Sequence, residues 1–167
     1  YETVTIDVSL PANAAANFDG TLDSTGDYVL VADDPLLDMT VMTMEAWVNW
    51  DGVTSFATVM SRPRADSGAP GTGMVLNIVS GVPTLGFNNG ANYNVSGSTS
   101  VTAGVWTHLA GTYDGQVLKV YADGVLGGTN DIGSAQNLLA SSAGLLMGRE
   151  FVTGLYNRGF SGQIDEA

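Results

Sequence analysis

Residues 105–124, VWTHLAGTYDGQVLKVYADG, decide the fold because they contain two strand patterns and the turns that close them. In the first half the side chains alternate between two faces of an extended chain. The two faces are Trp106, His108, Ala110 and Thr112 on one side and Thr107, Leu109, Gly111 and Tyr113 on the other. Each run ends in Asp-Gly, a strong hairpin signal because a type I′ turn needs positive φ at both of its residues. The stretch predicts an antiparallel meander.

Further strand patterns recur along the chain, separated by segments rich in glycine and polar residues. They lie at 28–31, 40–50, 56–61, 73–79, 82–87, 145–149 and 162–167. Short strands joined by turns at intervals of roughly 8 to 12 residues are typical of a β-sandwich. The sequence therefore predicts one all-β domain.

The central stretch, W-x-H-L-A-G-T-Y-D-G-x-x-L-K-V-Y-x-D-G, resembles the signature of laminin-G-like, concanavalin A-like jelly-roll domains. Three other pieces resemble the same family in the same order: ANFDG at 16–20 with DYVLV at 27–31, MTMEAWVN at 42–49, and LLMGRE with GFSGQIDEA from 145 to 167. The resemblance covers residues 16–167 and implies a two-sheet antiparallel jelly-roll sandwich. It does not fix the function, because this fold carries lectins, adhesion modules, enzyme appendages and structural domains.

The excess of acidic over basic residues limits the classes of molecule that we expect this chain to bind. The chain has 17 acidic and 5 basic residues among 167, a formal net charge of −12, and no cysteine. Nucleic acid and anionic lipid both attract clustered Lys and Arg, so we expect neither as a partner. No apolar run approaches the roughly 20 residues of a membrane span. The chain opens with Tyr, and with its acidity and the family resemblance this favours an extracellular or cell-surface location for a processed or excised domain.

The N-terminus carries a strand pattern that lies outside the resemblance. Residues 1–10 place Val4, Ile6, Val8 and Leu10 on one face, and residues 11–15, PANAA, predict a hinge before the sandwich at 16–167. In the resembled family the I-D-E motif continues as a strand, whereas here only Ala167 follows it. We expect residues 1–10 to fill that slot, either in their own chain or, by donor-strand complementation, in a neighbour. Exchange from head to tail would build a filament.

The resemblance also implies a calcium site. Its ligands would be the aspartates of F-D-G and I-D-E, Asp19 and Asp165 here, with Asp23 and Asp27 as additional ligands. Calcium binds six to eight oxygens, and residues 1–61 contain acidic side chains but no Lys or Arg. The alternative is that these aspartates cap their own turns.

Two loops combine an aromatic ring with polar groups, the arrangement that binds sugars. They are Tyr93 with Asn94, and Tyr156 with Arg158. His108, the only histidine, has no nucleophile beside it in a motif, and the dense carboxylate strand of jelly-roll glycosidases is absent, so we do not expect an enzyme. Trp47 and Trp106 are expected in the core and Trp50 partly exposed.

Two functional hypotheses follow. The first is a non-catalytic extracellular structural subunit that assembles with copies of itself through residues 1–10. The alternative is a calcium-stabilised carbohydrate-binding or adhesion module with glycans as partners. The first explains features that are peculiar to this chain, and the second would fit many members of the resembled family.

Overall fold

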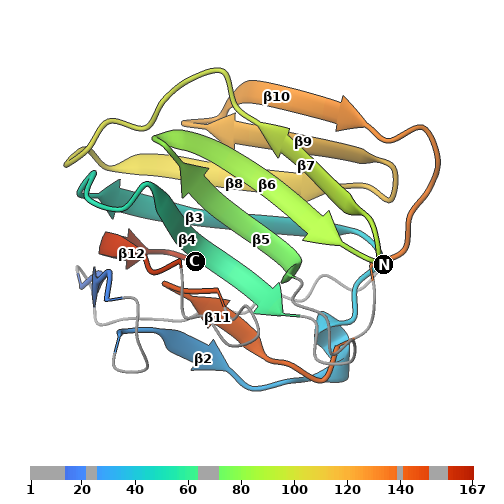
Figure 1. The fold of residues 1–167 in the computed structure, drawn as a ribbon, viewed down its shortest axis with the longest axis horizontal. Helices are drawn as coiled ribbons and strands as arrows, with labels where there is room; N and C mark the ends of the chain where they lie inside the picture. Colours follow the sequence, from blue (N-terminus) through green and yellow to red (C-terminus); the bar gives the residue numbers. More distant parts are fainter. Residues whose placement is uncertain (1–13, 22–25, 64–71, 139–140, 151–157) are drawn as a thin grey trace.

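The computed structural model describes residues 14–21, 26–63, 72–138, 141–150 and 158–167. They form two six-stranded antiparallel sheets packed face to face (Figure 1), as the sequence predicts. The β3 sheet has the order β1 (Ala16–Asp19), β12 (Ser161–Asp165), β3 (Met42–Trp50), β8 (Thr107–Tyr113), β9 (Val117–Ala122) and β10 (Val125–Asp131). The β5 sheet has the order β2 (Val29–Val31), β11 (Leu145–Met147), β4 (Phe56–Pro63), β5 (Thr72–Val79), β6 (Val82–Asn88) and β7 (Asn92–Ser96). No helix among the described residues is long and apolar enough to cross a membrane.

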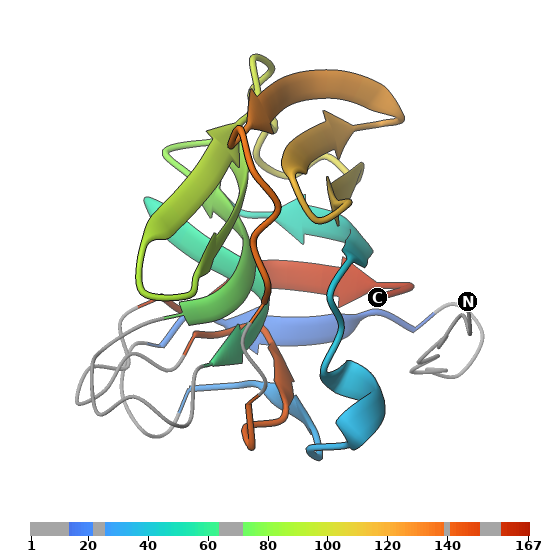
Figure 2. The ribbon, with the colours of Figure 1, turned by 90° about the vertical axis from the view of Figure 1, so that its right-hand side faces the viewer.

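The core lies between the two sheets, which Figure 2 shows as separate layers, with β6 and β7 on one side and β8 to β10 on the other. Apolar side chains alternate along the strands and point inward, as a half-buried strand requires. The fully buried ones include Leu76, Ile78, Leu85, Leu109 and Leu118. This packing fixes which side chains of the β5 sheet point outward to solvent.

The meander that decides the fold is β8, β9 and β10, and the structure decides which of its two predicted faces points inward. Thr107, Leu109, Gly111 and Tyr113 are buried, and β8 pairs with β9 and β9 with β10. The turn at Asp123 and Gly124 has the expected positive φ at both residues, 49° and 75°. The turn after β8 is different, because only Gly115 has positive φ there and Asp114 instead accepts hydrogen bonds from the next backbone N–H groups.

The tryptophans lie opposite to the sequence expectation. Trp50 is buried, with 7% of its surface exposed, whereas Trp47 and Trp106 are each 38% exposed. The inward face of β3 consists of Met42, Met44, Ala46, Val48 and Trp50. Since strand side chains alternate, Trp47 must point outward, where its ring meets that of His108 at a centroid distance of 5.4 Å.

The last strand, β12, lies between β1 and β3 and is hydrogen-bonded to both. It is short, as predicted, and ends at Asp165 opposite Trp47. Within the described part of the chain, residues 42–46 of β3 pair only with β8. The predicted assembly residues Val4, Ile6, Val8 and Leu10 and most of the predicted hinge lie outside the described residues.

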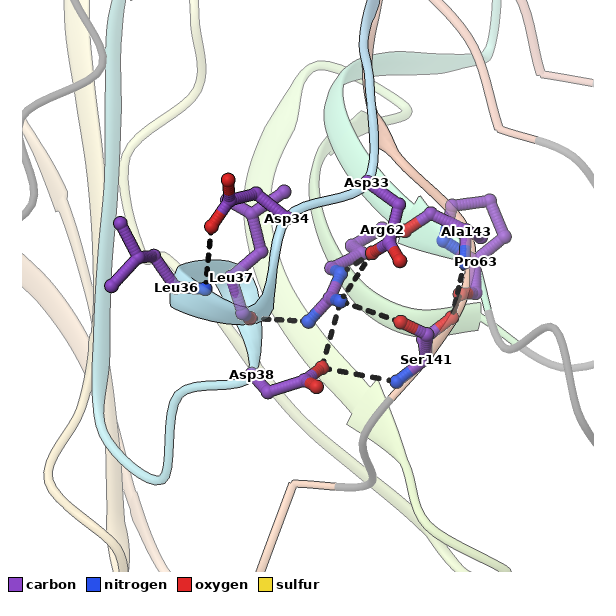
Figure 3. A network of polar contacts seen from close by, with 9 residues as sticks. All are labelled: Asp33, Asp34, Leu36, Leu37, Asp38, Arg62, Pro63, Ser141 and Ala143. Carbon is purple, nitrogen blue, oxygen red and sulfur yellow. Dashed lines mark hydrogen bonds and ion pairs between the residues drawn. The ribbon is translucent and has the colours of Figure 1, made fainter.

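A buried arginine ties irregular segments to the β5 sheet (Figure 3). The Arg62 guanidinium on β4, 3% exposed, forms ion pairs with Asp33 at 3.1 Å and Asp38 at 2.8 Å. It also donates to the backbone carbonyls of Leu37, Ser141 and Ala143. The short 3-10 helix η1 (Pro35–Leu37) and the segment before β11 are therefore held against β4 by one side chain.

Candidate functional site

A pocket of about 390 Å³ lies on the outer face of the β5 sheet, and this volume is in the range of small-molecule sites. Strands β4 to β7 form most of it, and two residues from the segment between β11 and β12 complete it. Its lining is Phe56, Val75, Asn77, Val79, Thr84, Gly86, Phe87, Asn88, Asn92, Tyr93, Asn94, Glu150 and Arg158. The pocket is rich in amide side chains and contains one carboxylate and one guanidinium.

Strand register assembles the floor of this pocket. The cross-strand pairs are Asn77 with Thr84, Gly86 with Asn94, and Asn88 with Asn92. Their chain neighbours Leu76, Leu85 and Val95 are buried between the sheets, so the pairs themselves face outward. Polar residues that are separate in sequence thereby meet in adjacent rows on one face.

Gly86 keeps the floor open. A Cβ atom at this position would lie 3.0 Å from the Tyr93 carbonyl oxygen and 3.4 Å from the Asn94 Cβ, which is tight packing. Since position 86 faces the pocket, any side chain there would also occupy its volume.

Glu150 and Arg158 form a partly buried ion pair beside the floor. Glu150 is 0% exposed, and its Oε2 accepts a hydrogen bond from Arg158 Nη1 at 2.9 Å. The Arg158 guanidinium also lies over the Phe56 ring, 3.9 Å from its centroid. Burial raises the pKa of the Glu150 carboxyl above its ordinary value, and the positive charge of Arg158 opposes that rise.

Two buried acceptor atoms of the lining have no hydrogen-bond partner among the described residues. They are Asn77 Oδ1, in a side chain that is 2% exposed, and Glu150 Oε1. Buried polar atoms are nearly always hydrogen-bonded in native proteins, because an unpaired one costs about 1–3 kcal/mol. Both residues line the pocket, so a molecule there could supply the missing donors.

The amide groups at the rim are held in place. Asn88 Nδ2 donates to Asn92 Oδ1 at 2.6 Å, and Asn88 Oδ1 accepts from the Gly90 N–H at 2.8 Å. These two contacts fix the rim before any ligand arrives, which lowers the entropic cost of binding. The Tyr93 ring points the other way, toward the core, where it packs on Phe87 at a centroid distance of 5.0 Å.

The structure brings three of the four predicted sugar-binding residues to this one pocket. Tyr93 and Asn94 come from β7 and Arg158 from the segment before β12, whereas Tyr156 lies outside the described residues. Sequence reasoning missed Asn77 and Glu150. A signal existed for Asn77, the single polar residue within the apolar run MVLNIV of β5; Glu150 had none, because its burial depends on the tertiary structure.

The predicted calcium ligands do not come together. Asp19 pairs with Ser161 in the ladder of β1 and β12, so Asp165 lies four positions, roughly 13 Å, further along β12. Calcium holds its oxygens at about 2.3–2.6 Å, and one ion cannot bind both carboxylates. Asp27 is exposed, Asp23 lies outside the described residues, and no group of three or more His, Cys, Asp or Glu within the described ranges could hold a metal. The predicted pairing of Asp19 with Asp165 in one site is wrong.

Asp19 instead caps its own turn. Its carboxylate accepts hydrogen bonds from the Thr21 N–H at 2.9 Å and the Thr21 hydroxyl at 2.7 Å, and these hold the pKa of Asp19 below its ordinary value. Asp165 accepts the N–H of Glu166 at 2.9 Å. This is the alternative role considered for these aspartates from the sequence.

Comparison with known proteins identifies a family that matches this chain. A family model described as the concanavalin A-like lectin/glucanases superfamily (Laminin_G_3) matches residues 23–167. A search of curated proteins found no match.

Similar solved structures share the fold at low sequence identity. The CBM40 of a Ruminococcus gnavus IT-sialidase bound to α2,3-sialyllactose has a TM-score of 0.73 and 16% identity, over 88% of this chain and 86% of that one. Domain 4 of AbnA, a GH43 extracellular arabinanase from Geobacillus stearothermophilus, in complex with arabinotriose, has a TM-score of 0.68 and 19% identity, over 98% and 73%. The mouse laminin α1 chain domains LG4–5 have a TM-score of 0.63 and 13% identity, over 90% and 39%. Since the family model spans nearly the whole chain and the sandwich agrees with it, the chain belongs to the concanavalin A-like lectin/glucanases superfamily.

Proposed function

We propose that this chain is a non-catalytic carbohydrate-binding module and that the pocket on the outer face of the β5 sheet is its binding site. The observation that carries the proposal is the pair of unpartnered buried acceptors, Asn77 Oδ1 and Glu150 Oε1, in a pocket with a prearranged amide rim. Sugar hydroxyls donate and accept hydrogen bonds, so they can pair with such acceptors and with asparagine amides at the same time.

The pocket also offers apolar surface beside its polar groups. Phe56, Val75 and Val79 line it together with the amides, and a sugar ring has both an apolar face and a polar edge. A glycan in this pocket would pack its ring carbons on these side chains and direct its hydroxyls toward Asn77, Asn94 and Glu150.

The similar structures support this proposal. Two of them carry oligosaccharides in their own complexes, sialyllactose and arabinotriose. One belongs to an enzyme described as extracellular, and another is part of a laminin chain. We therefore propose an extracellular location for this module too, with a glycan as its partner.

Binding rather than hydrolysis fits the chemistry of the pocket. Glycosidases of both common mechanisms use two carboxylates that flank the scissile bond. Glu150 is the one carboxylate among the described residues of the lining, and Arg158 is paired with it. His108 lies on the outer face of the other sheet, near Trp47 and Glu45.

The test is a glycan array followed by calorimetric titration of the best binder. Asn94→Ala removes an exposed amide from the rim and should weaken binding roughly tenfold, the equivalent of about 1.4 kcal/mol. The matched control is Asn49→Ala, an asparagine on β3 of the other sheet, which should bind as the wild type does. A wild type that binds no glycan, or equal losses in the two variants, would overturn the proposal.

Self-assembly is the second candidate, and the strand pattern of residues 1–10, with Val4, Ile6, Val8 and Leu10 on one face, favours it. The similar structures favour a binding module instead. Deletion of residues 1–10 tests this second hypothesis: strand exchange requires that assemblies seen by size-exclusion chromatography disappear in the deleted chain.

A further inference from the structure

We propose that the pocket on the β5 sheet selects uncharged glycans and rejects acidic ones. This inference rests on the proposed function and adds the class of sugar. It sets the chain apart from the structurally similar sialidase module, which is bound to α2,3-sialyllactose in its own structure.

The first step is the kind of group that the pocket lacks. Its two unpartnered buried atoms, Asn77 Oδ1 and Glu150 Oε1, are both acceptors, so a ligand must bring donors to them. A carboxylate or sulfate group only accepts hydrogen bonds, so it can pair with neither of these atoms. A sugar hydroxyl donates, and it can pair with either atom.

The second step is the charge that an acidic ligand would need. Arg158 is the only cationic side chain in the described lining, and its guanidinium already pairs with Glu150 at 2.9 Å. The charges of this pair cancel. If a ligand carboxylate drew Arg158 away, the Glu150 carboxylate would be left buried without its charge partner.

The third step is the electrostatic field that the charged residues of the whole chain produce around the pocket. The chain has a formal net charge of −12, and its five Lys and Arg residues are spread along the sequence. Among the other cations that the structure describes, Arg62 is paired with Asp33 and Asp38, Arg149 lies over the Tyr28 ring, and Lys119 lies on β9 of the other sheet. An anion that approached the pocket would meet net repulsion and no free positive group in the lining.

The experiment uses the full chain and matched oligosaccharides that differ in one charged group. The pairs are lactose against α2,3-sialyllactose and digalactose against digalacturonate, first on an array and then by titration. We expect the uncharged member of any bound pair to bind at least roughly tenfold more tightly, and its affinity to change little with salt.

Glu150→Gln tests the cause. The substitution keeps the shape of the side chain but leaves the Arg158 charge without its partner, so the affinity for the acidic member should rise relative to the uncharged one. Glu45→Gln removes the same charge from the outer face of β3 and should leave the preference of the wild type unchanged. Melting temperatures show whether the variants fold. If Glu150→Gln does not fold, the preference of the wild type for the uncharged or the acidic member of each pair tests the inference.

The outcomes separate the two proposals. Tighter binding of the acidic member by the wild type would overturn the inference and leave glycan binding at this pocket intact. Equal effects of Glu150→Gln and Glu45→Gln would also overturn it, because the preference would then come from net charge. A chain that binds no member of any pair would overturn the proposed function, and the inference with it.

Discussion

The outer face of the β5 sheet differs from an ordinary solvated face because it contains a polar atom that is buried and has no hydrogen-bond partner among the described residues. Asn77 lies opposite Thr84 with its Oδ1 buried and unpaired, an arrangement that lowers the stability of the free protein. Natural proteins keep such costs at functional sites, where stability and activity conflict. Asn77 therefore allows a direct test of whether this face is kept for binding.

Asn77→Leu should leave the melting temperature of the free protein unchanged or raise it, because an apolar side chain of similar size removes the unpaired buried oxygen. The same variant should lose glycan binding. Thermal unfolding and titration measure the two effects, with Asn49→Leu on β3 as the control for an added leucine on an outer sheet face. A loss of more than about 2 kcal/mol of stability would mean that Asn77 is a structural residue.

Glu150 also predicts a pH dependence. Because burial raises its pKa above the ordinary 4.5, the folded protein holds the proton more tightly than the unfolded chain, and stability should fall as pH rises from 4.5 through the raised pKa. Four aspartates have pKa values below the ordinary 3.8, and they stabilise the folded protein when they are ionised. Their contribution is therefore lost only as the pH falls below about 3.8, outside this window. They are Asp19, Asp38, Asp114 and Asp131.

Urea unfolding at a series of pH values measures this effect. The wild type should lose stability across the window above pH 4.5, and Glu150→Gln should show a smaller slope there. Parallel profiles for the two proteins would show that the Glu150 carboxyl does not change its proton affinity on folding.

At the scale of elements, strand β4 depends on the Arg62 network. Arg62→Ala would leave two aspartates and three backbone carbonyls without their donor, and we expect a loss of about 3–5 kcal/mol in the free energy of unfolding. Arg62→Lys should recover only part of it, because an ammonium lacks the planar fork that reaches several acceptors.

Denaturant titration measures these losses. Lys119→Ala on β9 is the matched removal of a cation and should change stability by no more than about 0.5 kcal/mol. Equal effects of Arg62→Ala and Lys119→Ala would show that Arg62 acts only through its charge on an acidic chain.

At the scale of the whole molecule, the net charge of −12 and the strand register together predict the response to calcium. The carboxylates of Asp19 and Asp165 lie at opposite ends of the β1 and β12 ladder, so divalent cations should act by screening rather than at a site shared by these two. Calcium and magnesium chloride at equal concentration should therefore raise the melting temperature by equal amounts. A larger shift with calcium would show a specific site elsewhere in the chain.

The sequence by itself determined the all-β sandwich, the meander of β8 to β10 and the division of β8 into two faces, because strand alternation and Asp-Gly turns are local properties. It also singled out Tyr93, Asn94 and Arg158, since an aromatic ring beside amides or charge is visible in a short segment. The outward position of Trp47, the separation of Asp19 from Asp165, and the meeting of Asn77 with Glu150 were decided only by the tertiary structure. Each depends on strand register or on burial by segments far apart in the chain, and neither quantity is encoded in any one stretch of sequence.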